Sequence, residues 1–421
     1  MTARTDVRLF GRHAGALWLE GNAAIPETWR FEYAADYLAA EAPALSVSLP
    51  LRAAPFEGAV VRNWFCNLLP EGAVRDAIER RLRLPSRDPF ALLGAIGGEC
   101  AGAVAIGTSD ARTNDARRAE PDLEALLVAQ GDDAGDGAWA ALGVPHRLSL
   151  AGAQDKIAVV RERDGRLRLP VGDELSTHIV KPESVRLPGL RDLEALGLSL
   201  ARAMGLDAVD AMPIELAGRP ALLVARYDRI VDGDGVARLH QEDFCQALGY
   251  PPELKYERGG GPTLAACAAL IRTKLRLGPV ALQAFLDWVV CNGVLGNADA
   301  HAKNLALLCG VDGRRRLAPF YDLVPTAVMA ESLVDREPAL VIGAAARIDR
   351  ITADDWRAFS AATGYASRFV LRRVAELAAS AREHAAIAAN ALVGRGADAA
   401  RMQRAVAFLE ANAERTLREL S

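Results

Sequence analysis

The hydrophobic pattern of the chain changes from strand-like alternation in its first half to helical spacing in its second half. Alternating apolar and polar residues predict a hairpin and then a series of short strands, over 7–20, 157–160, 167–169, 177–181, 211–216 and 221–224. One helix is inserted before the last two strands, where the helical spacing is carried by Leu193, Leu196, Leu200 and Ala203. A run of strands with one inserted helix predicts a mostly antiparallel sheet.

Helical patterns lie on both sides of this strand-rich region. Residues 64–82 are expected to form an interrupted helical segment. After Arg229 the pattern becomes helical, with a helix that begins at Pro279 and ends near Gly293. The Ala-rich C-terminal part predicts further helices with a break at 394–396.

Two polar stretches divide the chain. Residues 108–121 are polar, residues 130–137 are acidic and glycine-rich, and a short helix is expected between them at 123–129. We therefore predict an N-terminal subdomain, a linker region, a strand-rich lobe and a helical lobe, with the boundaries 1–107, 108–138, 139–228 and 229–421.

Composition narrows the class of protein without indicating a function. With 421 residues, of which 51% are apolar and 25% charged, the chain resembles an average globular protein of two or three lobes. A net charge of −4 argues against a protein that binds nucleic acid through its own basic surface. Uncharged stretches such as 259–271 are too short to span a bilayer, so no membrane association is expected. Six scattered cysteines without a C-x-x-C pair predict reduced thiols in a cytoplasmic protein.

The most informative stretch is 292–326, where one loop holds four polar residues: Asp299, His301, Lys303 and Asn304. Two short strands predicted after this loop form a hairpin that can bring Asp322 back beside Asp299. Phosphoryl transfer needs an Asp to take the proton of the attacking hydroxyl, and an Asn and a second Asp to bind Mg²⁺. Protein kinases place this Asn five positions after the base, as Asp299 and Asn304 are placed here. The alternative is an ordinary polar loop with helix-capping Asn and Asp residues.

A lysine for the nucleotide phosphates is expected upstream, in the strand-rich lobe. Lys181 ends the apolar strand predicted at 177–181, and Glu194 lies on the next helix. Kinases use a strand lysine to bind the α- and β-phosphates and a helix glutamate to hold that lysine. A solvated surface lysine is the alternative. The order of Lys181, Glu194, Asp299 and Asp322 along the chain favours a kinase instead.

Two further segments suit a nucleotide. The small-residue turn 149–156 precedes a predicted hairpin, and its backbone N–H groups can approach phosphate oxygens; the candidate residues are Ala151, Gly152, Ala153, Gln154 and Lys156. A buried strand ends at the predicted hinge between the lobes, where Ala225, Tyr227 and Asp228 are candidates for contact with adenine. Simple hinge packing is the alternative for Tyr227. The glycine run 259–262 could also cradle a phosphate, although a mobile loop is the favoured interpretation.

Taken together, the motifs resemble the HipA family, the serine/threonine kinases of type II toxin–antitoxin systems. The resemblance rests on seven ordered motifs: SLAGAQDK at 149–156, HIVKPE at 178–183, VARYDR at 224–229, HQEDFCQALG at 240–249, KYERGGGP at 255–262, GNADAHAKN at 296–304 and LAPFYDLVPT at 317–326. NLLPEG at 67–72 and DPFALLGAIGGECAGAV at 88–104 resemble the N-terminal domain of the same family. The resemblance thus covers nearly the whole chain.

The resemblance implies an α+β, protein-kinase-like fold of two lobes, a strand-rich N-lobe with an extra N-terminal subdomain and an all-helical C-lobe. It implies ATP and Mg²⁺ as cofactors, Asp299 as the catalytic base, and Asn304 and Asp322 as metal ligands. Lys181 would bind phosphates, and Ala225 stands where the family often has Glu, so that adenine would be held by backbone groups.

The resemblance also implies regulation and partners. Ser149 matches a serine that these kinases phosphorylate on themselves, which expels the phosphate loop and inactivates the enzyme. A dianionic phosphate at that position would repel the phosphates of ATP. The family implies a HipB-like helix-turn-helix antitoxin that provides the contact with DNA. It also implies a protein substrate, typically the glutamyl member of the aminoacyl-tRNA synthetases, whose phosphorylation causes growth arrest and persistence.

Two other functions remain as alternatives. A small-molecule phosphotransferase of the aminoglycoside or choline type would share the catalytic loop, but its usual H-G-D order and acidic substrate pocket are not evident. A catalytically silent co-repressor scaffold is disfavoured by the intact set of Lys181, Asp299, Asn304 and Asp322.

Overall fold

The computed structural model describes residues 3–40, 42–85, 87–107, 122–130, 137–142, 149–172, 174–233 and 235–420. The chain divides into two compact units, which are described one at a time. Unit 1 comprises Met1–Pro182, Glu215–Pro252 and Leu307–Arg315, and unit 2 comprises Glu183–Ile214, Glu253–Ala306 and Arg316–Ser421. Strands predominate in unit 1 and helices in unit 2, which confirms the α+β class. Of the linker segments predicted at 108–121 and 130–137, residues 108–121 and 131–136 lie outside the described residues.

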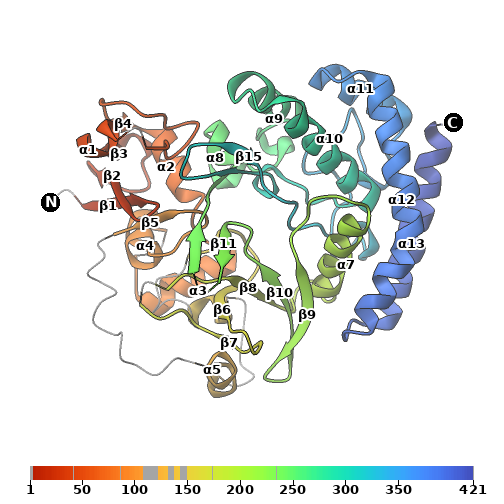
Figure 1. Ribbon diagram of the computed structural model, residues 1–421, viewed down its shortest axis with the longest axis horizontal. Coiled ribbons are helices and arrows are strands. Elements are labelled where there is room, and N and C mark those ends of the chain that lie inside the picture. The colour runs from red at the N-terminus through yellow and green to blue at the C-terminus, as the bar shows by residue number, and fades with distance from the viewer. Residues whose placement is uncertain are drawn as a thin grey trace. The chain divides into compact units, whose positions relative to one another are not determined.

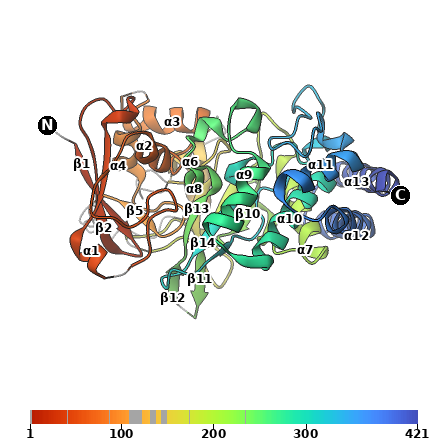
Figure 2. The ribbon, with the colours of Figure 1, turned by 90° about the horizontal axis from the view of Figure 1, so that it is seen from above.

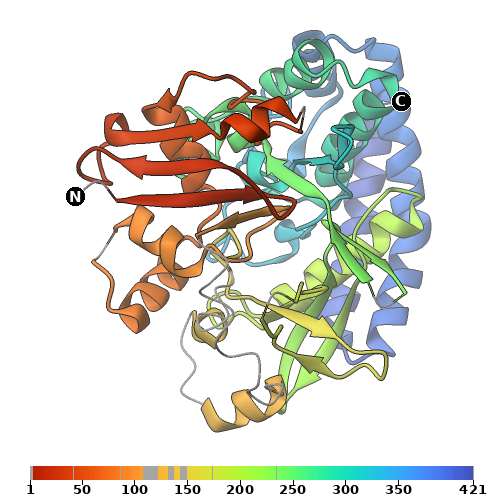
Figure 3. The ribbon, with the colours of Figure 1, turned by 60° about the vertical axis from the view of Figure 1, so that its left-hand side comes forward.

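The N-terminal part of unit 1 is a five-stranded sheet of order β4-β3-β2-β1-β5 with helices packed against it (Figure 3). Its strands are β1 (Arg4–Leu9), β2 (Arg12–Leu19), β3 (Trp29–Tyr33), β4 (Phe56–Glu57) and β5 (Val104–Ile106), and its helices are α1 (Ala35–Ala39), α2 (Ala59–Cys66), α3 (Gly72–Leu82) and α4 (Pro89–Ile96). The hairpin and the interrupted helical segment predicted from the sequence are both confirmed. Trp29, Phe31, Trp64 and Phe65 are fully buried in its core, and burial of such large rings is the main stabilising contribution.

A second five-stranded sheet has the order β7-β6-β8-β10-β9. Its strands are β6 (Ile157–Arg161), β7 (Leu167–Arg168), β8 (His178–Pro182), β9 (Ala211–Leu216) and β10 (Arg219–Ala225), and the short helices α5 (Leu123–Gln130) and α6 (Ala138–Leu142) precede them. The pairs β6–β7, β6–β8 and β8–β10 are antiparallel, as predicted. Lys181 is opposite Leu222 in the β8–β10 register, which fixes the lysine within the sheet.

The expectation of an all-helical lobe after residue 229 is wrong. Five short strands occur there: β11 (Arg229–Asp232), β12 (Gly235–Arg238), β13 (His240–Asp243), β14 (Ala306–Cys309) and β15 (Arg315–Leu317). β11 and β12 form an antiparallel hairpin, and β13, β14 and β15 form a small sheet. Alternation over three or four residues is too short to distinguish a strand from a helix in the sequence, which explains why β11 to β13 escaped prediction. The strands predicted at 305–308 and 316–320 correspond to β14 and β15.

Unit 2 is built mainly from helices. They are α7 (Leu190–Ala203), α9 (Leu264–Ala269), α10 (Gly278–Leu295), α11 (Ala353–Thr363), α12 (Ser367–Val393) and α13 (Ala399–Leu420), whereas the short α8 (Phe244–Leu248) belongs to unit 1. α12 and α13 lie side by side as a helical pair (Figures 1 and 2). Single-turn helices occupy Glu257–Gly259, Ala302–Asn304 and Thr326–Val328. The predicted break between the last two helices is confirmed.

α10 is the central helix of unit 2. Among the helices in the described ranges it is the one with the length and hydropathy of a membrane span, but 67% of that segment is buried inside the protein, as in a core helix. It ends at Leu295, two residues beyond the predicted end near Gly293. Gly293 is instead a packing position, because a Cβ there would lie 3.1 Å from Ile351 and 3.2 Å from Trp356.

Candidate active site

The predicted catalytic loop begins where α10 ends. Gly296 adopts the left-handed conformation, with φ +70°, and its N–H bonds back to the carbonyl of Gly293 at 3.2 Å. A glycine is required here for a second reason: a Cβ would lie 2.9 Å from both Ala327 and Phe408. The end of a buried helix therefore turns the chain sharply into the loop that carries Asp299.

Asn297 organises this loop. Its side-chain amide donates to Asn292 Oδ1 at 2.8 Å and to the carbonyl of Asp322 at 3.3 Å, and its Oδ1 accepts from the N–H of Asp299 at 3.2 Å. Asn297 is 1% exposed. One buried amide thus ties the backbone at Asp299 to the backbone at Asp322, which is 23 positions further along the chain.

Two more side chains hold the returning segment against the loop. Thr326 Oγ1 accepts from the N–H of Ala298 at 2.8 Å and donates to the carbonyl of Gly296 at 3.2 Å. The hydroxyl of Tyr321 donates to the carbonyl of Lys303 at 2.6 Å. These contacts support the sequence-based expectation that the hairpin carries Asp322 back to the loop. Asp322 itself has φ +51°, a strained conformation of the kind often found at functional sites.

Asp299 is exposed, and one of its carboxylate oxygens has a defined partner. The phenol of Tyr256 donates to Asp299 Oδ1 at 2.9 Å. The amide of Asn304 donates to the carbonyl of Asp299 at 3.2 Å, so Asp299 and Asn304 share a compact turn. The structure therefore brings these two predicted residues together. An exposed carboxylate in a rigid turn can accept a proton from a hydroxyl that approaches from solvent.

His301 lies in the same turn but is buried. Burial and the positive charges of Lys255 and Lys303 hold its pKa well below the usual value, and the carboxylate of Asp322 only partly opposes this shift. Its ring is therefore neutral at physiological pH, and its buried Nδ1 has no hydrogen-bond partner among the residues that the structure describes. Two lysines and an unsatisfied imidazole nitrogen make a site suited to anionic oxygens.

Asn304 and Asp322 have the chemistry of Mg²⁺ ligands. Mg²⁺ uses hard oxygen donors and is typically held by one or two carboxylates, with water and substrate phosphates completing the shell. Among the described residues no group of three or more His, Cys, Asp or Glu side chains is arranged to hold a metal. One amide oxygen and one carboxylate are too few to bind Mg²⁺ by themselves. They fit a magnesium ion whose remaining ligands come from the phosphates of a nucleotide and from water.

The predicted phosphate loop belongs to unit 1, where it is held by the N-terminal subdomain. Ser149 is completely buried; its hydroxyl donates to the carbonyl of Leu68 at 2.8 Å, and its N–H donates to the carbonyl of Glu99 at 2.9 Å. The N–H of Glu71 donates to the carbonyl of Gly152 at 3.0 Å. The loop is thus attached at Ser149 and Gly152 to the two segments, 67–72 and 88–104, that resemble the family's N-terminal domain.

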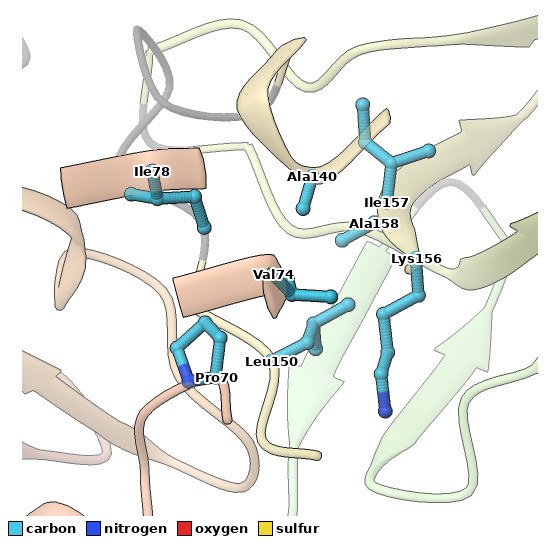
Figure 4. Close-up of a pocket in the computed structure, with 8 residues that line it drawn as sticks. All are labelled: Pro70, Val74, Ile78, Ala140, Leu150, Lys156, Ile157 and Ala158. Atoms are coloured by element: carbon cyan, nitrogen blue, oxygen red, sulfur yellow. The ribbon is translucent and has the colours of Figure 1, made fainter. Parts of the chain in front are cut away.

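Lys156 braces the same loop from within. Its ammonium donates to the carbonyl of Ala151 at 2.6 Å. Gly152 has φ +114°, and a Cβ there would lie 2.8 Å from Lys156 Nζ, so the lysine passes closely under the turn. Figure 4 shows Lys156 at the edge of a pocket that is otherwise apolar and is lined by Pro70, Val74, Ile78, Ala140, Leu150, Ile157 and Ala158. Ala153 is exposed at the tip of the turn, and Gln154 is half-buried.

Lys181 and Glu194 fall in different units. Lys181 lies in β8 of unit 1 and is 6% exposed, and Glu194 lies in α7 of unit 2 and is 2% exposed. Their ion pair stays a prediction. Within unit 2, α7 packs closely on the segment that carries Asp322, because a Cβ at Gly197 would lie 1.9 Å from the carbonyl oxygen of Leu323.

The segment 225–228 ends β10 in unit 1. Ala225 is half-buried opposite His178, and the hydroxyl of Tyr227 hydrogen-bonds Gln241. The carboxylate of Asp228 is buried: it accepts from Arg226 at 2.6 Å and from the N–H of Gly102 at 2.6 Å. These contacts give the side chain of Asp228 a structural role, and an adenine contact at this position stays a prediction.

Asp228 belongs to a buried ion network that the sequence did not reveal. Glu99 Oε1 accepts from Arg226 at 3.1 Å, from Arg229 at 2.8 Å and from the hydroxyl of Ser176 at 2.7 Å. Burial alone would raise the pKa of Glu99, but the two guanidinium groups outweigh it and hold the pKa below its usual value. The signal in the sequence is the pair of arginines flanking Asp228 in the motif 224–229.

Sequence reasoning missed Tyr256 and Asn297 as site residues. Both lie inside recognised motifs, at 255–262 and 296–304, but neither has a side chain that kinase chemistry demands. Their contacts with Asp299 depend on where the backbone places them, and no local spacing encodes this.

Comparison with known proteins assigns the fold to a family. A family model described as the HipA-like C-terminal domain matches residues 148–385, and one described as the HipA N-terminal domain matches residues 5–107. "Putative kinase Y4mE" of Sinorhizobium fredii is 40% identical over 345 residues, covering 80% of this chain and 81% of that protein. "Serine/threonine-protein kinase toxin HipA" of Shewanella oneidensis is 30% identical over 324 residues, covering 72% and 71%.

A solved structure agrees with these matches at the level of the fold. The structure of HipA of Shewanella oneidensis MR-1, in a complex with HipB and operator DNA, matches with a TM-score of 0.81 and 24% identity, over 99% of this chain and 98% of that one. The C-terminal family model covers more than half of the chain, and the relatives are 30% or more identical over more than two thirds of it. The chain therefore belongs to the HipA family.

Proposed function

We propose that this protein is the toxin of a toxin–antitoxin system, an ATP-dependent serine/threonine kinase that transfers the γ-phosphate to a protein hydroxyl. The observation that carries the proposal is the single turn containing Asp299 and Asn304, tied through Asn297 to the backbone of Asp322. This set supplies a base and two oxygen ligands in one rigid unit, as phosphoryl transfer requires.

In the proposed reaction, Asp299 orients the attacking hydroxyl and accepts its proton as the oxygen–phosphorus bond forms. The bond between the γ-phosphorus and the bridging oxygen breaks, and ADP leaves. Asn304 and Asp322 would hold Mg²⁺, and the bound ion would neutralise negative charge on the phosphates. Because His301 is neutral and has an unsatisfied Nδ1, it suits a hydrogen bond to a phosphate oxygen, and Lys303 adds positive charge nearby.

The nucleotide would be held mainly by residues of unit 1. Lys181 is proposed to bind the α- and β-phosphates, with Glu194 as its partner. Backbone N–H groups of the turn that contains Gly152 would contact phosphate oxygens. Backbone groups at Ala225 and the ring of Tyr227 would face the adenine. Because position 225 is Ala and not Glu, its contact with adenine would come from the main chain.

Ser149 is proposed as a site of autophosphorylation that switches the kinase off. Its complete burial against Leu68 supports this, because a phosphoserine cannot occupy a fully buried position without an arginine or a cavity to receive it. The phosphorylated loop would have to leave its present position. Release of the loop must also precede modification, since a buried hydroxyl cannot reach Asp299.

The partners follow from relatives and remain proposals. A HipA protein has been solved with HipB and operator DNA, which supports a HipB-like helix-turn-helix antitoxin as the partner of this chain. The net charge of −4 supports contact with DNA through that partner. We propose an aminoacyl-tRNA synthetase as the protein substrate, growth arrest and persistence as the consequence, and the cytoplasm as the location.

The direct test is phosphorylation of the purified protein. Incubation with Mg²⁺ and ATP should add one phosphate that maps to Ser149 by mass spectrometry. Asp299→Asn should lower the rate by about 10²–10⁴-fold, because the proton acceptor is lost. Asp354→Asn, a change at an exposed carboxylate on α11, is the matched control and should leave the rate unchanged. An unmodified parent protein after long incubation would refute the active kinase.

Substrate and toxicity need a test in cells. Brief induction of the parent protein should arrest growth, and phosphoproteomics should show a phosphosite on one aminoacyl-tRNA synthetase. Asp322→Ala should relieve the arrest and remove the phosphosite, because a metal ligand is lost. Equal toxicity of Asp322→Ala would count against kinase activity as the cause of arrest.

A further inference from the structure

The motif at 255–262 has no part in the mechanism described above, yet it places a hydroxyl on the catalytic base. The phenol of Tyr256 lies 2.9 Å from Asp299 Oδ1. We propose that Tyr256 is a positioning residue that holds the carboxylate of Asp299 in the orientation needed to accept the substrate proton. The proposal rests on the proposed kinase function and adds a residue to its machinery.

The ring of Tyr256 is fixed by the loop it serves. It meets the ring of His301 edge to face, with centroids 5.4 Å apart and an interplanar angle of 79°. His301 is 8% exposed, and its backbone N–H donates to the carbonyl of Asp299 at 2.8 Å. Lys255 Nζ lies 5.4 Å from the centroid of the Tyr256 ring. The contact with the buried histidine thus helps to keep the phenol on Asp299, although 38% of Tyr256 is exposed.

The glycine run 259–261 that follows Tyr256 holds the backbone of the tyrosine in place. The N–H groups of Gly259 and Gly261 donate to the carbonyl of Tyr256 at 3.2 and 3.1 Å. A Cβ at Gly261 would lie 2.1 Å from the carbonyl oxygen of Leu254 and 2.6 Å from that of Tyr256. Only glycine allows the chain to fold back this closely. The run predicted as a phosphate cradle or a plain loop is thus a support for the tyrosine backbone.

The backbone of the motif is also tied to the catalytic loop and its neighbours. The N–H of Ala302 donates to the carbonyl of Lys255 at 3.3 Å, and the N–H of Glu257 donates to the carbonyl of Ala339 at 2.9 Å. Tyr256 is thus anchored on both sides of its Cα. An exposed aspartate without such a partner samples several rotamers, whereas a base acts efficiently only when it is held within a fraction of an ångström.

The test separates the hydroxyl of Tyr256 from its ring. Tyr256→Phe keeps the packing on His301 and removes the bond to Asp299. We expect kcat at saturating ATP to fall about tenfold with an unchanged KM for ATP, because the phenol contacts the base and not the nucleotide. Tyr365→Phe is the matched control; it removes a tyrosine hydroxyl that donates to the carbonyl of Leu282, in the same unit, and should leave kcat unchanged.

A double variant identifies the route of the effect. In the Asp299→Asn background the residual rate should not change further with Tyr256→Phe, because the residue acts through the base. Equal kcat for Tyr256→Phe and the parent would overturn the proposal. So would a faster Tyr256→Phe, which would make the tyrosine an inhibitor that blocks the base, and so would a change in KM alone.

A spectroscopic readout makes the inference independent of activity. Protein labelled with 3-fluorotyrosine should show a fluorine resonance for Tyr256, assigned by its absence in Tyr256→Phe. Asp299→Ala should shift this resonance and leave that of Tyr365 in place. An unshifted resonance would overturn the contact itself. If Asp299→Ala shifts the resonance but the parent protein shows no phosphorylation that depends on Asp299, the contact stands and the proposed function is refuted. The two failures are therefore distinguishable.

Discussion

The catalytic loop and the phosphate loop are both short turns rich in small residues, but they are held in different ways. In the catalytic loop, side chains reinforce the backbone hydrogen bonds: the amide of Asn297, the hydroxyl of Thr326 and the phenol of Tyr256 bind backbone or carboxylate groups. In the phosphate loop, the attachments to the N-terminal subdomain are the hydroxyl and N–H of Ser149 and the carbonyl of Gly152.

This difference matches what each loop has to do. The catalytic loop must keep its donors and acceptors within a fraction of an ångström for phosphoryl transfer. The phosphate loop is held at the very residue proposed to be modified, so one covalent change removes an attachment and adds charge at the same point. Charge in a fully buried position costs several kcal/mol when it is unpaired. We infer that the first loop is built for rigidity and the second for release.

The largest expected effect separates the two loops directly. Ser149→Asp places a carboxylate beside the carbonyl of Leu68 in a fully buried site, which should disfavour the present loop position by several kcal/mol. Amide hydrogen exchange over 149–156 should become fast, and ATP binding should be lost. Ser149→Ala removes one hydrogen bond and should cost about 1 kcal/mol. Parent-like exchange in Ser149→Asp would show that the loop is not built for release.

A second variant addresses the rigid loop. Asn297→Ala removes three hydrogen bonds, one of them to the buried side chain of Asn292, and unties the backbone at Asp299 from that at Asp322. We expect the free energy of unfolding to fall by about 1–3 kcal/mol, with a lower rate of phosphoryl transfer. Denaturant titration and a kinase assay provide the two measurements. Asn390→Ala, an exposed asparagine on α12, is the control and should change neither quantity.

A third variant tests how α7 supports Asp322. Gly197→Ala would bring a Cβ within 1.9 Å of the carbonyl oxygen of Leu323, so α7 or the segment after Asp322 must move. Overpacking of this kind costs about 1–3 kcal/mol, and we expect kcat to fall with it. Gly94→Ala in α4 meets open space and should be neutral or slightly stabilising. Identical kcat values for both variants would mean that α7 does not position Asp322.

The smallest expected effect concerns the attachment of the N-terminal subdomain. Glu242 in β13 accepts hydrogen bonds from the hydroxyl of Ser46 and from the N–H of Val47, and burial raises its pKa from 4.5 to about 7. The folded protein therefore keeps a proton that the unfolded chain releases above about pH 4.5. The stability that this carboxyl contributes falls as the pH rises from about 4.5 to about 7.

Comparison with Glu242→Gln isolates this carboxyl, because all other groups titrate alike in both proteins. The parent protein should lose stability relative to Glu242→Gln as the pH rises through that window, measured by denaturant titration at several pH values. Glu253→Gln, at an exposed position, should leave the profile unchanged. A constant difference between the parent and Glu242→Gln would contradict a raised pKa.

Local patterns predicted the elements that depend on neighbouring residues. The hairpin β1–β2, the strands β6 to β10 and the helices α7 and α10 follow from alternation, helical spacing and turn residues. The four-residue strands β11 to β13 did not follow, because so short a segment pairs according to its partner and not its own pattern. The end of α10 was displaced because Gly293 is a packing residue against Trp356 and not a helix terminator.

The chemistry of the site was likewise divided between sequence and structure. The sequence indicated the α+β class, the HipA resemblance and the candidate residues Asp299, Asn304 and Asp322, because their types and spacing match what phosphoryl transfer requires. Tertiary structure alone decided that Tyr256 bonds to Asp299, that Asp228 belongs to a buried ion network, and that Ser149 is enclosed by the N-terminal subdomain. Such contacts join segments distant in the chain, and burial and hydrogen bonding across that distance arise only once the chain has folded.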